Sequence, residues 1–350
     1  MAGIEELLKV IKQHNASDLH LVSGSAPYIR LAGDMVRLNY KSVSAEVCQA
    51  LVYGVLTDRQ REQFEENLEL DLSLAVRDLG RFRVNVFMQR AGLAAVFRHV
   101  PDEVPTTAEL GLPGQVIDLV DVSEGLVLVT GPTGSGKSTT LASIIHTINE
   151  TRRAHVITIE DPIEFVHQNR QCLINQREVS SHTHSFSNAL RAALREDPDI
   201  ILVGEMRDLE TISLAITAAE TGHLVFATLH TNSAIKAVDR IIDVFPEGQQ
   251  AQIRTMLSES LRGVVAQALL PRADGKGRVA AAEVLVNVPA VANLIREGKA
   301  FQIPSVMQTG RAQGMLTFDT SINDLVRAGA VTAKEGQTFL ARRAAGGKRA

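Results

Sequence analysis

The sequence contains no tryptophan, only three tyrosines and only two cysteines among its 350 residues. Cys48 and Cys172 are far apart and form no C-x-x-C pair, which excludes a tetracysteine zinc site and suits a reducing compartment. We expect both thiols to be small buried side chains. No apolar run approaches the length of a membrane-spanning helix, and the first residues lack the basic start and apolar core of a signal peptide. The sequence therefore predicts no direct membrane insertion.

The chain also lacks an excess of positive charge. It has 36 lysines and arginines against 40 aspartates and glutamates, for a net charge of −4. A RecA-like nucleic-acid motor, which is one alternative, would need a basic groove and aromatic side chains on which bases stack. We therefore expect no nucleic-acid partner. Hydrophobic residues make up 45% of the chain, enough for sizeable cores, and the length indicates two or three domains.

The pattern of apolar residues changes after about one hundred residues. Residues 1–100 contain short alternating runs and helices with good N-caps, which predict a small mixed domain with a mostly antiparallel sheet. We expect residues 101–112 to form a proline-containing linker. From 113 to 345, apolar strands alternate with helices, which predicts an α/β domain with a mainly parallel sheet. We expect the basic stretch from Arg342 to be disordered and assign 346–350 as a flexible tail.

We expect strands and helices to alternate along the second domain. The predicted strands are 126–130, 156–159, 200–204, 224–229 and 278–286. The predicted helices are 138–149, 186–196, 207–221, 233–244 and 248–269, with shorter helices after the last strand.

A glycine-rich loop lies between the first of these strands and the first helix. Its sequence, from Gly131 to Ser138, reads G-x-x-x-x-G-K-S, the P-loop pattern in its expected strand–loop–helix context. Backbone N–H groups of such a loop cradle phosphates, and the helix N-terminus adds partial positive charge. Lys137 can reach the β- and γ-phosphates, and the Ser138 hydroxyl can bind Mg²⁺. The predicted nucleotide-binding residues are Gly131, Pro132, Thr133, Gly134, Ser135, Gly136, Lys137, Ser138 and Thr139.

Acidic residues follow two of the strands. Glu160, Asp161 and Glu164 come after strand 156–159, where a nucleotide site needs a carboxylate to orient water. We favour Glu164 for this role, with Glu160 close behind, and a solvated acidic turn is the alternative. Glu205 ends the apolar strand 200–204 in a Walker B pattern. It would hold Mg²⁺ or polarise the attacking water.

Two histidines flank strand 224–229. His230 follows the strand, where it could sense the γ-phosphate through water. His223 precedes the strand, and a structural role is the alternative for both side chains. We include both among the candidate catalytic residues.

These motifs occur in a fixed order along the chain: GPTGSGKST, ITIEDPIEF, REDPDIILVGEMRD and TGHLVFATLHT. The order resembles that of the secretion-motor ATPases of type II secretion and type IV pili, and the resemblance covers nearly the whole chain. Within that superfamily the chain is most similar to the type IV pilus retraction ATPases, the PilT family. It starts directly with the small domain, lacks a tetracysteine zinc module and contains Asn293-Leu294-Ile295-Arg296-Glu297, as in the retraction subgroup's AIRNLIRE segment. Ala292 departs from that segment, where the subgroup has arginine.

The resemblance implies a fold and a set of further site residues. It implies a PAS-like α+β N-terminal domain joined to a RecA-like P-loop ATPase domain that includes the C-terminal helices. It also implies that nucleotide binds between the domains and that N-terminal arginines reach the phosphates; Arg81, Arg83 and Arg98 match that pattern. Arginine suits this role because its planar fork binds phosphate oxygens bidentately. A solvated sheet face is the alternative for these side chains.

The implied function is a mechanochemical one. A homo-hexamer would hydrolyse ATP with Mg²⁺ to drive pilus retraction for twitching motility, in the cytoplasm at the inner face of the cell membrane. Its expected partners are an inner-membrane pilus platform protein and a paralogous retraction ATPase. The alternatives are a pilus-assembly or type II secretion ATPase and an accessory retraction ATPase.

Overall fold

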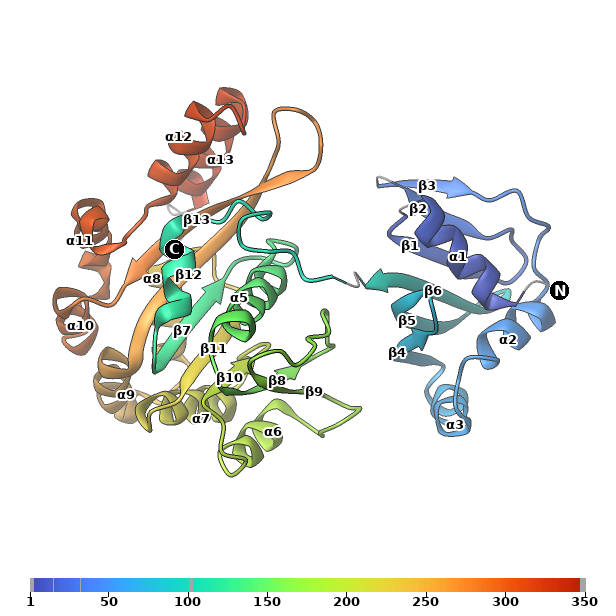
Figure 1. Cartoon of the computed structure of the whole chain (residues 1–350), viewed down its shortest axis with the longest axis horizontal. Helices are drawn as coiled ribbons and strands as arrows, with labels where there is room; N and C mark the ends of the chain where they lie inside the picture. The colour runs from blue at the N-terminus through green and yellow to red at the C-terminus, as the bar shows by residue number, and fades with distance from the viewer. Residues whose placement is uncertain (1–2, 15, 32, 101–102, 347–350) are drawn as a thin grey trace. The chain divides into compact units, whose positions relative to one another are not determined.

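A computed structural model describes residues 3–14, 16–31, 33–100 and 103–346 of the chain. The chain divides into two compact units, residues 1–103 and residues 104–350 (Figure 1). The first two residues of the expected linker lie outside the described residues, and its part from Val104 onward belongs to the second unit. Within the described residues, no helix is long and apolar enough to cross a membrane.

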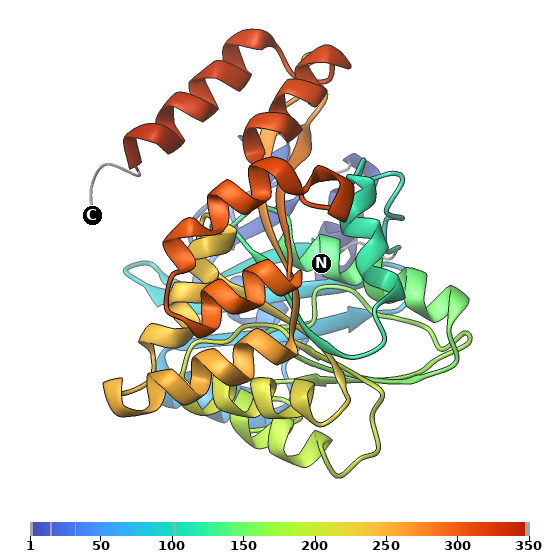
Figure 2. The same cartoon turned by 90° about the vertical axis from the view of Figure 1, so that its left-hand side faces the viewer.

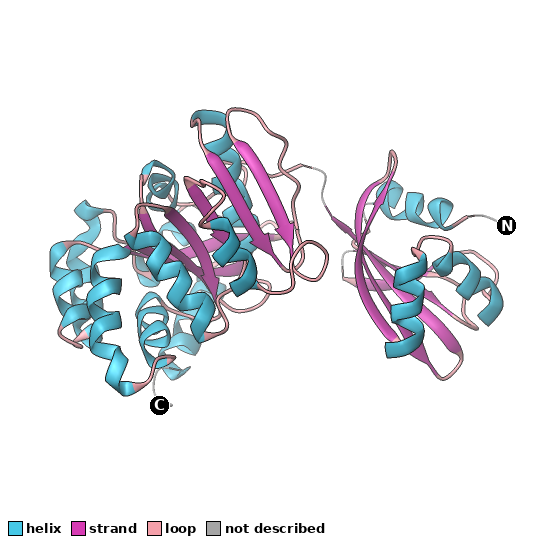
Figure 3. Ribbon diagram, turned by 90° about the horizontal axis from the view of Figure 1, so that it is seen from below, coloured by secondary structure: helices cyan, strands magenta, loops and turns pink. Residues whose placement is uncertain are grey.

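The first unit is an antiparallel sheet with helices on one face (Figure 3). The strands lie in the order β3-β2-β1-β6-β5-β4. They are β1 (Asp18–Val22), β2 (Tyr28–Leu31), β3 (Asp34–Arg37), β4 (Glu69–Val76), β5 (Gly80–Gln89) and β6 (Gly92–Val100). The helices are α1 (Ile4–His14), α2 (Ala45–Tyr53) and α3 (Asp58–Asn67). The antiparallel sheet is as predicted, and the likeness to a PAS domain stays a prediction.

Local sequence explains the helices of this unit. In α1 the apolar side chains recur at helical spacing, and Ile4, Leu7, Leu8 and Ile11 are all buried against the sheet. The Thr57 hydroxyl caps α3 by accepting a hydrogen bond from the main-chain N–H of Gln60, and Ser44 caps α2 in the same way. Helices placed like this leave the opposite sheet face to polar side chains.

The second unit is built on a sheet in the order β13-β12-β7-β11-β10-β8-β9. All its neighbouring strands are parallel except β12 and β13, which pair antiparallel. The strands are β7 (Gly125–Thr130), β8 (His155–Glu160), β9 (Leu173–Glu178), β10 (Ile200–Val203), β11 (Leu224–Leu229), β12 (Leu261–Pro271) and β13 (Arg278–Val286). This confirms the predicted α/β class with its mainly parallel sheet.

Helices cover both faces of this sheet, so successive residues of a central strand are buried on opposite sides. In β7, Leu126 and Leu128 join one hydrophobic core, and Val127 and Val129 join the other. The helices are α4 (Gly114–Ile117), η1 (Asp118–Asp121), α5 (Lys137–Thr151), α6 (Phe186–Ala193), α7 (Leu209–Glu220), α8 (Ala234–Asp243), α9 (Glu247–Ser260), α10 (Pro289–Arg296), η2 (Ala300–Gln302), α11 (Ile303–Thr309), η3 (Gly310–Gln313), α12 (Phe318–Arg327) and α13 (Ala333–Gly346).

The C-terminal helices α12 and α13 pack together against the β12–β13 pair (red, Figures 1 and 2). The predicted disorder from Arg342 is therefore wrong for the residues up to 346, which continue α13. Residues 347–350 of the expected flexible tail lie outside the described residues.

The predicted helix over 248–269 is wrong in its second half. The helix α9 ends at Ser260, and β12 begins at the next residue. The run after Ser260 is almost wholly apolar, and such a run fits a buried strand as well as a buried helix. The run forms a strand because it pairs with two neighbouring strands, β7 and β13. The prediction also missed β9, an edge strand with polar residues.

Candidate nucleotide-binding site

The parallel sheet brings the predicted motifs to one edge. Because β7, β8, β10 and β11 are parallel, their carboxyl ends lie at the same edge of the sheet. The glycine-rich loop follows β7, Glu205 follows β10 and His230 follows β11. The acidic turn from Asp161 to Glu164, named here the Asp-box turn, follows β8. Ligands of open α/β sheets bind at this edge.

The glycine loop has a backbone that other residues would not adopt. Gly131, Gly134 and Gly136 have φ angles of 153°, 77° and 90°. Helix α5 begins immediately after Gly136 and has no side-chain cap. Its first main-chain N–H groups are therefore available to an anion, as phosphate binding requires.

The lysine of the loop folds back over it. Lys137 Nζ donates hydrogen bonds to the main-chain oxygens of Gly131 at 2.8 Å and Pro132 at 3.2 Å. Burial lowers the pKa of Lys137, and the negative charges of Glu205 and Glu164 partly oppose that shift. The ammonium group therefore lies in the field of both carboxylates, at a place suited to a charged phosphate.

Both oxygens of the Glu205 carboxylate are engaged. His230 Nε2 lies 2.7 Å from Oε1, and Arg207 Nη2 lies 2.6 Å from Oε2. Burial alone would raise the pKa of Glu205, but the hydrogen bonds and positive charges of Arg207 and His230 outweigh it and lower the pKa. Glu205 is therefore held as a carboxylate, the form that binds Mg²⁺ or accepts a hydrogen bond from water.

The two favoured water-orienting carboxylates have different surroundings. Glu164 is exposed, and its charge acts on Lys137. Glu160 accepts hydrogen bonds from Thr158 Oγ1 at 2.6 Å and Gln176 Nε2 at 3.1 Å, and its burial raises its pKa. Glu164 is thus free to meet a ligand, whereas Glu160 is held within the protein.

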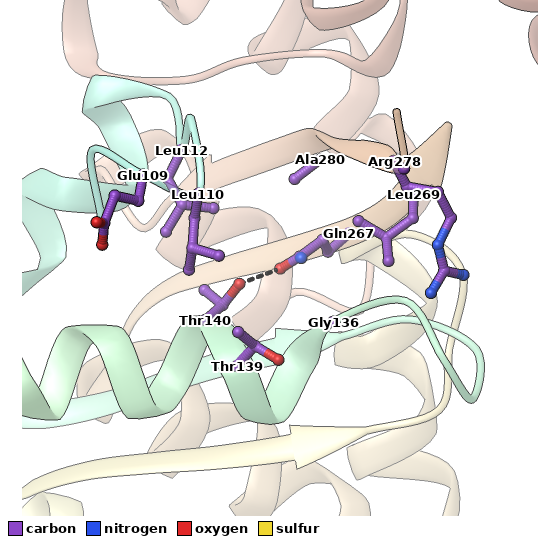
Figure 4. A pocket seen from close by; sticks show the side chains of 11 residues that line it. Glu109, Leu110, Leu112, Gly136, Thr139, Thr140, Gln267, Leu269, Arg278 and Ala280 are labelled. Atoms are coloured by element: carbon purple, nitrogen blue, oxygen red, sulfur yellow. Dashed lines mark hydrogen bonds between the residues drawn. The ribbon is translucent and has the colours of Figure 1, made fainter. Parts of the chain in front are cut away.

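A cavity of about 390 Å³ lies beside the glycine loop (Figure 4). Its volume is in the range of small-molecule sites. Its lining residues come from the loop and α5, from the segment before α4, and from the β12–β13 pair: Glu109, Leu110, Leu112, Gly136, Thr139, Thr140, Gln267, Leu269, Gly277, Arg278 and Ala280. Apolar side chains beside a phosphate loop suit a nucleoside.

Comparison with known proteins identifies the family. The family model described as "Type II/IV secretion system protein" matches residues 2–287. The chain belongs to this family.

Relatives within the family resemble the chain over most of its length. It is 55% identical to a type IV pilus retraction ATPase, PilT, of Pseudomonas aeruginosa over 94% of this chain and 95% of the relative. It is also 55% identical to a twitching motility protein of Neisseria gonorrhoeae, over 94% of this chain and 88% of the relative. The crystal structure of a pilus retraction motor PilT with bound ADP matches with a TM-score of 0.91 and 48% identity, covering 96% of each chain. Within the secretion family, the chain therefore groups with the pilus retraction ATPases.

One predicted site residue of this family member lies away from the others. His223 stands at the amino end of β11, where its main-chain oxygen accepts from the N–H of Gly125 at the start of β7. Its ring contacts the oxygen of Ala218 and the hydroxyl of Thr221. The glycine loop follows the other end of β7. Within this chain His223 therefore lies at the opposite sheet edge from the glycine loop, and its catalytic role stays a prediction.

The predicted arginines lie in the first unit, on the sheet face that the helices leave uncovered. In β5, Arg81 and Arg83 alternate with the buried Phe82 and Val84. Arg83 stands opposite Arg98 of β6 in the strand register, and both side chains are exposed. The three arginines therefore share one face of the sheet.

Sequence reasoning missed Asp18, which supports one of these arginines. The Asp18 side chain is only 2% exposed, and its Oδ1 accepts a hydrogen bond from Arg98 Nε at 2.7 Å. Its pairing with Arg98 requires β1 and β6 to be neighbours, which no local pattern reveals.

Two further residues of the ATPase unit were also missed. Arg207 lies in the Walker B block of the sequence, but nothing there shows that it binds Glu205. Glu178 is buried and accepts hydrogen bonds from the main-chain N–H of Ile163 at 3.0 Å and from Ser181 Oγ at 2.9 Å. It supports the Asp-box turn from β9, the strand that the prediction lacked.

Proposed function

We propose that the chain is the subunit of a hexameric, ATP-hydrolysing motor that drives retraction of type IV pili. The observation that carries the proposal is its 55% identity to a pilus retraction ATPase over nearly its whole length. The glycine loop, Lys137, Glu205 and His230 at one sheet edge supply the chemistry that such a motor needs. The neighbouring cavity has room for a nucleoside.

Phosphate binding is assigned to the loop and to the start of α5. The main-chain N–H groups from Gly134 to Thr139 would face the phosphate oxygens, with the helix dipole favouring their negative charge. Lys137 would exchange its bonds to the oxygens of Gly131 and Pro132 for bonds to the phosphates. The charge of the leaving and transferred groups is thereby neutralised.

Mg²⁺ would be held by the Ser138 hydroxyl and the Glu205 carboxylate. Among the residues that the structure describes, there is no group of three or more His, Cys, Asp or Glu side chains able to hold a metal. This fits Mg²⁺, which takes one or two protein oxygens and otherwise keeps water and phosphate oxygens. When bound, the ion would neutralise charge on the β- and γ-phosphates.

We assign orientation of the attacking water to Glu164, because it is exposed and acts on Lys137. Glu160 is the second candidate, and its hydrogen bonds from Thr158 and Gln176 suit a supporting role. His230 contacts the Glu205 carboxylate and would respond to the presence of the γ-phosphate through this contact. Each of these side chains comes from a strand end at the same edge.

We further propose that Arg81, Arg83 and Arg98 supply positive charge to the transition state. An arginine provided in this way can raise the hydrolysis rate by roughly 10³- to 10⁵-fold. Turnover would then depend on how the first unit meets the nucleotide, which offers a way to couple hydrolysis to movement. The same proposal includes a PAS-like first unit and a RecA-like second unit. It also includes the expected domain boundaries at residues 100, 112 and 345.

The setting of the motor is proposed from the same relatives. The chain would assemble as a homo-hexamer in the cytoplasm, at the inner face of the cell membrane. There it would bind an inner-membrane pilus platform protein and work beside a paralogous retraction ATPase.

The test combines biochemistry with a retraction assay. The purified protein should hydrolyse Mg-ATP as an oligomer of about six subunits, measured by phosphate release and native mass. Cells whose only retraction ATPase carries Lys137→Ala should extend pili that do not shorten, and the purified variant should lose ATP turnover while folding normally. The exposed, distant Lys334→Ala serves as the matched control. Full turnover by folded Lys137→Ala, or normal retraction in cells that lack the chain and its paralogue, would refute the proposal.

A further inference from the structure

Strand β12 reaches past the end of its neighbour β7. The β7–β12 pairing ends where Ala266 stands opposite Thr130, the last residue of β7. Gln267 is therefore the first β12 residue beyond β7, and it lies where the chain of β7 turns into the glycine loop. The side chain is only 4% exposed.

Both the main chain and the side chain of Gln267 press against the loop. A Cβ atom built on Gly131 would lie 2.5 Å from the main-chain oxygen of Gln267. A Cβ atom built on Gly136 would lie 2.9 Å from Gln267 Nε2. Separations below 3.0 Å are essentially never observed for real Cβ atoms. Two of the loop glycines are thus packed tightly against one residue of another strand.

The same side chain also binds the helix that follows the loop. Gln267 Oε1 accepts a hydrogen bond from Thr140 Oγ1 at 2.8 Å (Figure 4). Thr140 is only 1% exposed, so neither partner can exchange this bond for water without a rearrangement. Gln267 therefore contacts the beginning of the loop, its end and the first turn of α5.

Strand β12 also forms part of the nucleoside-sized cavity. Gln267 and Leu269 line it from β12, and Arg278 and Ala280 line it from β13 (Figure 4). The two strands pair from Gly263 opposite Val286 to Pro271 opposite Arg278. A shift of this strand pair would consequently move the cavity wall and the phosphate loop together.

We propose that Gln267 is a positioning residue for the phosphate loop: it fixes the loop in its binding shape and ties it to the β12–β13 pair. The proposal rests on nucleotide hydrolysis as part of the proposed function, but not on the pilus as the load. Because the loop contacts phosphate in both ground and transition states, loss of this support should weaken nucleotide binding more than it slows chemistry.

Isosteric variants test the hydrogen bond. Thr140→Val removes the donor and keeps the shape, whereas Thr140→Ser keeps the hydroxyl. Gln267→Met removes the acceptor at similar volume, and a double variant combines it with Thr140→Val. Thr147→Val on α5 and Gln308→Met on α11 are the control substitutions, because neither residue lines the cavity.

We expect Thr140→Val and Gln267→Met each to raise the KM for ATP and the Kd for Mg-ADP about three- to tenfold, with kcat changed less than twofold. Thr140→Ser and both controls should match the wild type. The double variant should be no weaker than the weaker single variant, because both changes remove one bond.

Three results would overturn the inference. The first is unchanged KM and Kd in both single variants, even with lowered thermal stability, since that is what a purely structural bond predicts. The second is a multiplicative effect in the double variant, and the third is a Thr140→Ser defect equal to that of Thr140→Val. If Gln267→Met fails to fold, the comparison of Thr140→Val with Thr140→Ser is sufficient to test the inference. A wild type without ATP turnover would instead contradict the proposed function.

Discussion

Arg343 donates a hydrogen bond to the main-chain oxygen of Asn232 at 2.7 Å, although the two residues are 111 positions apart. The same guanidinium pairs with Glu283 at 3.2 Å and lies over the Phe318 ring, 4.0 Å from its centroid. Glu283 in turn accepts a hydrogen bond from the main-chain N–H of Ala234, at the start of α8. The C-terminal helix α13 thereby holds the loop that follows His230.

Arg343→Ala should destabilise the second unit by about 2–4 kcal/mol, because it leaves Glu283 buried without its cation. Released from α13, the loop after β11 should also hold His230 less firmly, and kcat should fall. Chemical denaturation and ATP turnover measure the two effects. The adjacent, exposed Arg342→Ala is the matched control and should change neither. Equal stability of the two variants would show that the pair contributes nothing.

Glu205→Gln should separate binding from hydrolysis. The amide keeps the size of the side chain but lacks the charge that faces His230, Arg207 and the proposed Mg²⁺ site. ATP turnover should fall at least about 100-fold, the scale of a lost catalytic group. Nucleotide affinity, followed with a fluorescent ADP, should fall far less than in Lys137→Ala. Turnover within twofold of the wild type would exclude Glu205 from the chemistry.

Glu160 should make stability depend on pH in a defined direction. Burial raises the pKa of Glu160 above its usual value, so the folded state binds this proton more tightly than the unfolded state does. The stability linked to this group is full below the unfolded pKa and is lost as pH rises through the folded one. Glu160→Gln removes that loss, so its stability relative to the wild type should increase from pH 4 to pH 7. Denaturation curves across this range, with the exposed Glu335→Gln as the control, provide the measurement. A constant difference between Glu160→Gln and the wild type would contradict the prediction.

His167 should act in the opposite direction. Burial, aided by the charge of His146, lowers its pKa from 6.5 to about 4. The folded state therefore excludes a proton that the unfolded state binds, and stability is lost as pH falls from 6.5 toward 4, by about 3 kcal/mol. His167→Gln should lose less stability than the wild type between pH 7 and pH 5. His184→Gln, at an exposed position, should follow the wild-type curve. Parallel curves for all three proteins would exclude His167 as the source.

The phosphate loop could be predicted because its requirements are local. Glycine φ angles, a lysine and a helix start all occur within eight residues, so the pattern of Gly131 to Ser138 contains the geometry. The strand-end acids were found for a related reason, since parallel strands bring their carboxyl ends together. The position of Glu205 therefore followed from the strand before it.

The residues that escaped prediction depend on partners distant in sequence. Gln267 matters through Thr140, and Arg343 through Asn232 and Glu283, so neither shows a local signal. Strand β12 was predicted as helix for the same reason, because its apolar run shows no strand alternation. His223 shows the converse: a motif groups it with the other site residues, but it lies at the end of β11 away from the loop, which the motif alone does not reveal.

The bond between Asp18 and Arg98 has a geometric consequence for the first unit. A guanidinium whose Nε is bonded to a buried carboxylate can still donate from its two terminal nitrogens to another anion. A lysine carries a single ammonium nitrogen, so it could not bind Asp18 through one nitrogen and present other nitrogens to an outside anion. Exchanging Arg98 for lysine would therefore preserve the charge of this sheet face but lose the fixed direction of the terminal N–H groups.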